Sequence, residues 1–268
     1  MPKRAATTTR DVGSAVHALC TAFPGAEAFT SHGAPNFRVR GRTFATYAVN
    51  LHGDGRVALW LNAPAGAQEQ LVRDAPKHFF VPPYVGPRGW LGVRLDTGLA
   101  WPRVVQLVRE AWEKTAPPAL AAALDAPVAV EAPTKALAPE QLDRLASPHA
   151  RRVVEKLRRI CLALPETREA RQFGNPVWQA GKRTFAVAYD YGEGLRLGFW
   201  VGVDQQGLYT SDPRFTIPPY TGHNGWIALD ASRACDWAEI RSLAHASYRH
   251  FALKRMLAQL DRPVGGRG

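Results

Sequence analysis

The sequence predicts an α+β protein built from two tandem two-layer domains, and three observations support this class. FFVPPYVGPRGWL at residues 79–91 recurs as FTIPPYTGHNGWI at residues 215–227, with Phe, Pro-Pro-Tyr, Gly and Gly-Trp in the same places. Apolar residues recur at helical spacing near the start and the end of each copy. Between these helices, apolar and polar residues alternate as they do in half-buried strands.

The repeat covers nearly the whole chain. APNFRVRGRTFA at residues 34–45 recurs as NPVWQAGKRTFA at residues 175–186, and the helical segment at residues 101–112 recurs at residues 237–248. Such self-similarity indicates a tandem duplication. A chain of 268 residues is also long enough for two domains of ordinary size.

The domain boundaries follow from composition. We expect one domain at residues 8–120 and a divergent second copy at residues 148–260. Residues 121–147 are rich in Ala and Pro and are typical of a linker. Ser147 suits an N-cap with Pro148 at the first helical position, which marks the start of the second copy.

The elements of one unit can be predicted in chain order. In the second copy, the first helix is indicated by apolar residues at helical spacing: Val153, Val154, Leu157, Ile160, Cys161 and Leu164. In the first copy, a strand at residues 43–51 precedes a turn, HGDG, and a second strand through Trp60. A short helix fits residues 64–75, the Pro-rich segment leads into a further strand, and residues 101–112 form the closing helix. This order favours an antiparallel sheet covered by helices on one face.

These segments resemble the MmcQ/YjbR family. The resemblance rests on SHGAPNFRVRGRTFATY, HGDGRVALWLNAP and FFVPPYVGPRGWLGVRLD, and it extends more weakly over residues 152–258. It implies a two-layer fold in the order helix, three strands, helix, two strands, helix, and a DNA-binding role. Relatives often carry a lysine where Trp60 and Trp200 stand, which argues against a phosphate contact at these two positions.

No constellation typical of an enzyme is found in the sequence. GxSxG, HExxH and GxGxxG are absent, and GNPVWQAGKR at residues 174–183 has the wrong spacing for a phosphate loop. Cys20 and Cys161 lie on the apolar stripe of the first helix of each copy and are expected to pack rather than react. We expect a protein that is not an enzyme, with no catalytic residue, metal site or cofactor.

The charge has two readings. Lys and Arg number 34 against 23 Asp and Glu, which gives a formal net charge of +11. A field of this sign attracts polyanions such as nucleic acid. The alternative is an Arg-rich composition without a binding role.

Basic residues form two patterns and two isolated positions. Arg38, Arg40 and Arg42 alternate along a predicted strand and would share one face, while Arg152, Lys156 and Arg159 fall on one ridge of a helix. Two further candidates are single positions in the repeat, Arg88 and Arg183. These residues are candidates for phosphate contacts, and a solvated surface is the alternative reading.

Aromatic residues recur in both copies. Strand alternation points Trp60 and Trp200 away from their apolar neighbours, onto a sheet face that a two-layer fold leaves open. There they could stack on a base or a flat ligand, or this face could be buried by the other unit or by a second chain. Further ligand or interface candidates lie in the repeated Pro-rich segment: Tyr84, Trp90, Tyr220, His223 and Trp226.

The sequence therefore supports two functional hypotheses. The first is a non-enzymatic protein that binds DNA through backbone phosphates. The second is a module that binds a small molecule or a protein through the aromatic face. The chain has no long apolar run, and its N-terminus has no apolar signal core, so we expect a soluble, cytoplasmic protein with no membrane contact. Contact between the two domains, or assembly of copies of the chain, is compatible with both hypotheses.

Overall fold

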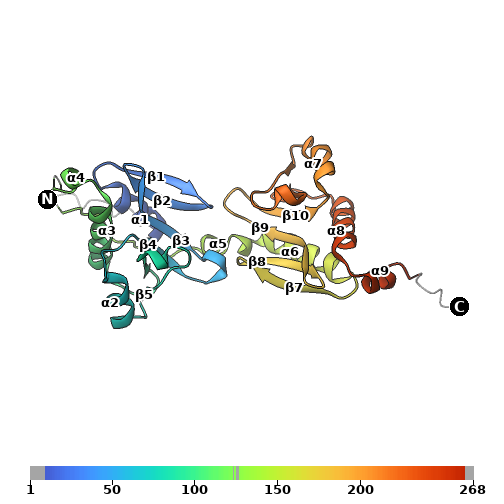
Figure 1. Ribbon diagram of the computed structural model, residues 1–268, viewed down its shortest axis with the longest axis horizontal. Helices are drawn as coiled ribbons and strands as arrows, with labels where there is room; N and C mark the ends of the chain where they lie inside the picture. Colours follow the sequence, from blue (N-terminus) through green and yellow to red (C-terminus); the bar gives the residue numbers. More distant parts are fainter. Residues whose placement is uncertain (1–9, 123, 125–126, 263–268) are drawn as a thin grey trace, which may run out of the picture. The chain divides into compact units, whose positions relative to one another are not determined.

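The computed structural model describes residues 10–122, 124 and 127–262 and divides into two compact units, Met1–Leu142 and Asp143–Gly268 (Figure 1). The division falls inside the segment expected as a linker. Residues 8 and 9 of the expected first domain, and residues 123, 125 and 126 of the expected linker, lie outside the described residues.

The first unit is an antiparallel sheet covered by helices. Its strands have the order β1-β2-β3-β4-β6-β5, and every neighbouring pair is antiparallel. The elements are α1 (Val12–Thr21), β1 (Ala26–Ser31), β2 (Ala34–Val39), β3 (Arg42–Val49), η1 (Leu51–Gly53), β4 (Val57–Leu61), α2 (Ala67–Asp74), β5 (Phe79–Phe80), η2 (Gly86–Arg88), β6 (Leu91–Arg94), α3 (Trp101–Thr115), α4 (Pro118–Ala122) and α5 (Pro139–Leu142).

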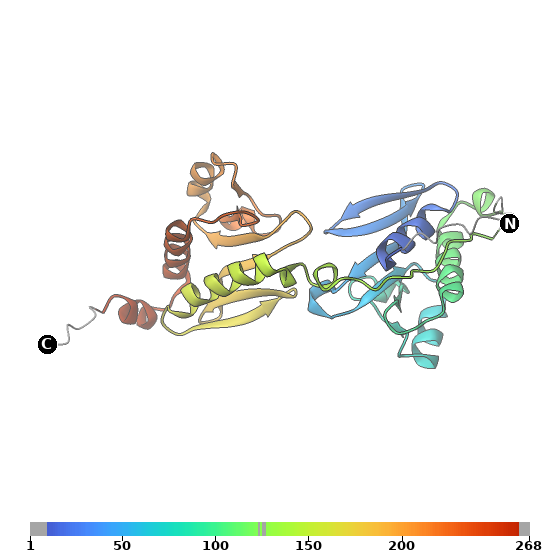
Figure 2. The ribbon, with the colours of Figure 1, turned by 180° about the vertical axis from the view of Figure 1, so that it is seen from behind.

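The second unit repeats this arrangement, with strand order β11-β12-β10-β9-β8-β7 (Figure 2). Its elements are η3 (Arg144–Ala146), α6 (Pro148–Leu162), β7 (Thr167–Gln172), β8 (Asn175–Ala180), β9 (Arg183–Tyr189), β10 (Arg196–Trp200), α7 (Val203–Thr210), β11 (Phe215–Thr216), η4 (Gly222–Asn224), β12 (Trp226–Asp230), α8 (Trp237–Phe251) and α9 (Lys254–Leu260). The α+β class with two tandem domains and antiparallel sheets is confirmed.

The number of strands differs from the expectation. Four strands, not three, precede the middle helix of each unit, because β1 and β7 each form one edge of the sheet. Their sequences, AEAFTS and TREARQ, contain no buried residue, so they carry no apolar pattern from which a strand could be predicted. Backbone pairing with β2 and β8, rather than side-chain burial, holds these edge strands.

Each core lies between the sheet and its two long helices. In the first unit, α1 and α3 contribute Val16, Leu19, Leu107 and Val108, all buried. The equivalent helices α6 and α8 cover the second sheet. Cys20 and Cys161 are fully buried within these cores, and burial raises the pKa of both thiols, which suits packing and not nucleophilic attack.

Much of the Ala/Pro-rich segment belongs to the first unit. The Trp101 indole Nε1 donates to the carbonyl of Val130 at 2.9 Å, and the Thr134 N–H donates to the carbonyl of Arg10 at 2.9 Å. Val128, Val130, Leu137 and Leu142 pack against the same core. We call residues 127–142 the return segment. Among the described residues, no helix is long and apolar enough to cross a membrane.

Candidate nucleic-acid interface

The repeated Pro-rich segments form the same loop in both units. We call residues 79–91 and 215–227 the PPY loops. In each, the carbonyl of the first proline accepts from a glycine N–H: Gly86 N–H to Pro82 at 2.9 Å, and Gly222 N–H to Pro218 at 3.0 Å. Gly89 and Gly225 follow with positive φ and turn the chain into β6 and β12.

A buried glutamine supports each PPY loop, and sequence reasoning missed it. The Gln68 amide on α2 donates to the carbonyls of Gly86 (2.8 Å) and Trp90 (2.5 Å). The Gln206 amide on α7 donates to the carbonyls of Gly222 and Trp226, both at 2.7 Å. Gln68 is the second residue of α2 and Gln206 is the fourth of α7, so the repeat does not align the two glutamines and gave no signal for them.

The PPY-loop tyrosines are exposed and have an unusual backbone. Tyr84 has φ 65° and Tyr220 has φ 68°. Tyr84 is 67% exposed and Tyr220 is 70% exposed. The Tyr84 hydroxyl lies 3.1 Å from Nε2 of His52, and the two rings meet edge to face with centroids 5.6 Å apart.

The aromatic face of the first sheet is not open. Trp60 is on the opposite face from Leu59 and Leu61, as the alternation predicts, but it is only 6% exposed. It is covered within its own unit by four residues: Leu51, Phe80, Val85 and Trp90. The expectation of an open face around Trp60 is therefore wrong, because the PPY loop folds back over it.

Trp200 is also engaged within its own unit. Its ring stacks on His250 with centroids 3.4 Å apart and planes 13° apart, and its Nε1 donates to the carbonyl of Asn224 at 2.9 Å. Trp226 stacks on Phe251 at the end of α8. Burial, and then the charge of Arg183, lowers the pKa of His250, which favours the neutral form of the imidazole.

The arginines of the β2–β3 hairpin do not share one strand face. The chain reverses at Arg40 and Gly41, which both have positive φ, so Arg38 and Arg42 lie on opposite sides of a two-residue turn. The expectation of a continuous arginine track is wrong for this reason. Arg38 is further engaged by Glu27, at 3.0 Å, and by the ring of Phe29.

The basic ridge on α6 is present. Arg152, Lys156 and Arg159 are exposed, and so is Arg151, which lies about 100° from Arg152 around the helix. Two of them make side-chain contacts: the Arg159 Nε donates to Glu155 at 3.1 Å, and the Lys156 Nζ lies 4.5 Å from the ring centroid of Trp237. Glu155 is the single acidic residue among the fifteen of this helix, against five basic ones.

A cleft of about 490 Å³ opens beside this ridge. Its basic lining comprises Arg151, Arg152, Arg158 and Arg171, and its other lining residues are Asp143, Leu145, Ala146, Val154, Glu155 and Pro176. Arg158 is fixed by two carboxylates: its Nε and Nη2 donate to Glu169 at 2.6 and 2.9 Å, and its Nη1 donates to Glu155. The hydrogen bond from Arg158 lowers the pKa of Glu169.

The first unit has an equivalent cleft with different chemistry. It measures about 470 Å³ and lies between α1, β2 and β3, lined by Gly13, Ser14, His17, Pro35, Phe37 and Tyr47. By the repeat, Ser14 and His17 correspond to Glu155 and Arg158. The cleft therefore recurs in both units, but arginines line it only in the second.

The remaining candidates lie at separate places. Arg88 and His223 are exposed at the tips of the two PPY loops, and Arg183 is exposed at the start of β9. The structure does not bring them together with the α6 ridge into one site within a unit.

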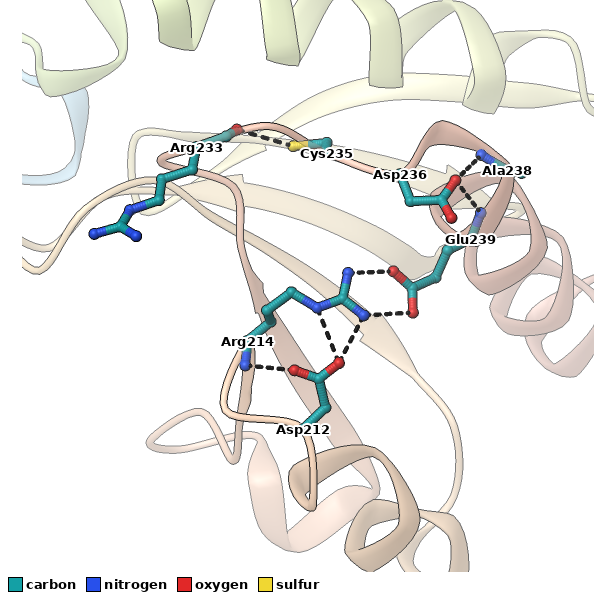
Figure 3. Close-up of polar contacts among 7 residues, drawn as sticks. All are labelled: Asp212, Arg214, Arg233, Cys235, Asp236, Ala238 and Glu239. Carbon is teal, nitrogen blue, oxygen red and sulfur yellow. Dashed lines mark hydrogen bonds and ion pairs between the residues drawn. The ribbon is translucent and has the colours of Figure 1, made fainter.

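Arg214, in contrast to the candidates above, is held by carboxylates of its own unit. Figure 3 shows the Arg214 guanidinium between the carboxylates of Asp212 and Glu239, with Nη2 at 2.6 and 3.2 Å from them. Arg214 lowers the pKa of Asp212 by donating these hydrogen bonds. Asp236 accepts from two backbone N–H groups and caps α8 in the same view. Two carboxylates thus balance the charge of Arg214, whereas the exposed Arg159 of α6 pairs with one, that of Glu155, which Arg158 also contacts.

The described residues contain no group of three or more His, Cys, Asp or Glu side chains placed to hold a metal ion.

Comparison with known proteins identifies the domain. The YjbR family model matches residues 21–114 and again residues 162–250, together more than half of the chain. No curated protein matches. The crystal structure of Deinococcus radiodurans protein DR2400, a DUF419 domain, is similar at 20% identity and a TM-score of 0.35, over 43% of this chain and 92% of that one. The two separate matches of the family model coincide with the two structural units, and the chain therefore belongs to the YjbR family and carries its domain twice.

Proposed function

We propose that this protein binds DNA through backbone phosphates and that the α6 face of the second unit is the main contact. The observation that carries this proposal is the exposure of Arg151, Arg152, Lys156 and Arg159 on one helix. Exposed guanidinium and ammonium groups on one helix face are the groups with which proteins contact phosphate oxygens.

The comparison of the two units supports this placement. The equivalent helix of the first unit, α1, contains no lysine or arginine, and its cleft is lined mainly by uncharged residues. The net charge of the whole chain is +11, which attracts polyanions. Phosphate contacts of this kind give affinity without base preference.

The test measures duplex DNA affinity as a function of salt. Each phosphate that the protein neutralises contributes about −0.9 to the slope of log affinity against log salt. Reversing three charges together (Arg152→Glu, Lys156→Glu and Arg159→Glu) should flatten the slope by roughly two to three units and lower the affinity at low salt. Fluorescence anisotropy of a labelled duplex gives both quantities.

A matched control keeps the same change in net charge. Arg241, Lys254 and Arg262 are exposed residues of the same unit outside α6. Their reversal to glutamate should change the slope by less than the α6 variant does. An equal effect of both variants would show that only the net charge matters, and no binding of the wild type at low salt would refute the proposal.

The same proposal includes two further expectations: the protein is not an enzyme, and it is located in the cytoplasm. The second hypothesis, a ligand on an open aromatic face, is less well supported, because Trp60 is covered by Phe80, Val85 and Trp90 of its own unit.

A further inference from the structure

Each unit presents one tyrosine to solvent from the same position of its PPY loop. We propose that Tyr84 and Tyr220 are stacking platforms for unpaired bases of single-stranded nucleic acid. The inference rests on the proposed function, because it assigns base contacts to a protein whose phosphate contacts lie on α6.

The backbone at both tyrosines is unfavourable for their side chain. A positive φ of 65° or 68° is rare for a bulky residue, whereas glycine adopts it readily. Two-thirds or more of each residue is exposed, so the ring is not there to fill a core. Strained residues held by their surroundings are concentrated at binding sites. The same strained, exposed tyrosine in both units therefore points to a contact with another molecule.

The backbone of each PPY loop is held from within its own unit. The two prolines before each tyrosine have their own φ angles fixed by their rings. After the tyrosine, the buried amide of Gln68 or Gln206 donates hydrogen bonds to two backbone carbonyls of the same loop. In the first unit, the edge contact with His52 also orients the ring of Tyr84. A ring that is already ordered loses little conformational entropy when a base stacks on it.

Charge favours nucleic acid over a peptide as the occupant. Neither PPY loop contains an acidic residue. Arg88 is exposed four residues after Tyr84, and the Arg56 guanidinium lies 4.3 Å from the centroid of the Phe80 ring on the same loop. In the first unit, where Arg56 also pairs with Asp54 at 3.8 Å, the exposed Arg88 on the loop of Tyr84 provides charge for a phosphate and the tyrosine ring provides a face for the base. Such stacking tolerates any base, because every base has a π-face.

The test uses the full chain and two oligonucleotides of about 16 nucleotides, which is near the upper site size of a single-strand-binding module. One is oligothymidylate, and the other is an abasic strand of the same length and charge. The double variant Tyr84→Ala with Tyr220→Ala should bind oligothymidylate at least about tenfold more weakly and bind the abasic strand as the wild type does. The matched double variant with phenylalanine keeps both rings and should stay within about twofold of the wild type.

A stability measurement separates binding from folding. The double variant Tyr84→Gly with Tyr220→Gly removes the backbone strain, so its Tm should equal or exceed that of the wild type while stacking is lost. A lower Tm would give the tyrosines a structural role and overturn the inference.

The remaining outcomes distinguish this inference from the proposed function. One outcome would refute the stacking platforms but not the proposed function: the alanine variant binds oligothymidylate as the wild type does, while reversal of the α6 charges still abolishes duplex binding. A peptide would then be the favoured partner of the PPY loops. An equal loss for both oligonucleotides also overturns the platforms. If the wild type binds neither duplex nor single strand, both proposals fail.

Discussion

A buried glutamine amide supports each PPY loop, and the two glutamines make the same pair of hydrogen bonds in the two units. A side chain that satisfies two buried carbonyls at once is costly to remove, because both carbonyls then remain in an apolar setting without water. At the scale of single residues, such groups are the least visible from sequence, since a polar residue in a short amphipathic helix is normally expected at the surface.

Gln68→Ala should destabilise the first unit by about 1–3 kcal/mol, the usual cost of an unsatisfied buried polar group. Urea unfolding measures this free energy. Gln70→Ala on the same helix removes an exposed glutamine and serves as the control. Equal stability of the two variants would show that the Gln68 amide does not support the loop.

The titration of Tyr248 should make the stability of the second unit depend on pH. Its hydroxyl donates to the carbonyl of Pro165 at 2.7 Å, and burial, with a smaller effect of Glu166, raises its pKa to about 12. The folded state holds this proton more tightly than the unfolded state does, so its stabilisation is complete below about pH 10 and is lost as the pH rises toward 12. Tyr189, whose pKa is also raised to about 12, acts in the same direction.

Tyr248→Phe should therefore lower stability by about 1 kcal/mol at neutral pH and weaken the loss of stability between pH 10 and 12. Tyr47→Phe is the contrasting variant. The Tyr47 hydroxyl has no hydrogen-bond partner among the described residues, so its removal should not lower the Tm. A drop in Tm for Tyr47→Phe equal to that for Tyr248→Phe would contradict this distinction.

At the scale of elements, the sequence predicts best what is buried. The helices α1, α3, α6 and α8 and the strands β3 and β4 have apolar periodicity, and the structure confirms them. The edge strands β1 and β7 have none, because backbone pairing alone forms them. The α6 ridge was found because helical spacing is regular, whereas the hairpin turn at Arg40 broke the alternation assumed for the neighbouring arginines.

The covering of Trp60 shows a second limit. Strand alternation tells which face a side chain occupies, but not whether a distant loop folds over that face. The contact between Trp60 and the PPY loop joins β4 to residues about twenty to thirty positions later in the chain, and a single sequence does not encode such a contact as a local pattern.

At the scale of the whole molecule, the return segment changes where the first unit ends. Residues 127–142 are bound to the first unit through Trp101 and Arg10, although their composition is that of a linker. Composition reports the tendency of a segment to form helices or strands, but an irregular segment can also pack when it carries spaced Val and Leu residues.

Limited proteolysis tests this assignment. Trypsin should separate the chain into two resistant fragments, and the N-terminal fragment should retain the return segment, with cleavage after Arg144 preceding cleavage after Lys135. Both residues are exposed, so accessibility of the side chain alone does not decide the order. Mass spectrometry of the first products identifies the site. Early cleavage after Lys135 would show that the segment behaves as a free linker.

The paired clefts beside α1 and α6 have a consequence for how a duplicated protein acquires a second use. The backbone that forms the cleft is shared by the copies, while the side chains at its rim have diverged, from Ser14 and His17 to Glu155 and Arg158. Arginines line the rim in one copy only, so two clefts of one architecture differ in charge, and either rim can be altered by exchanging a few of its residues for those of its twin.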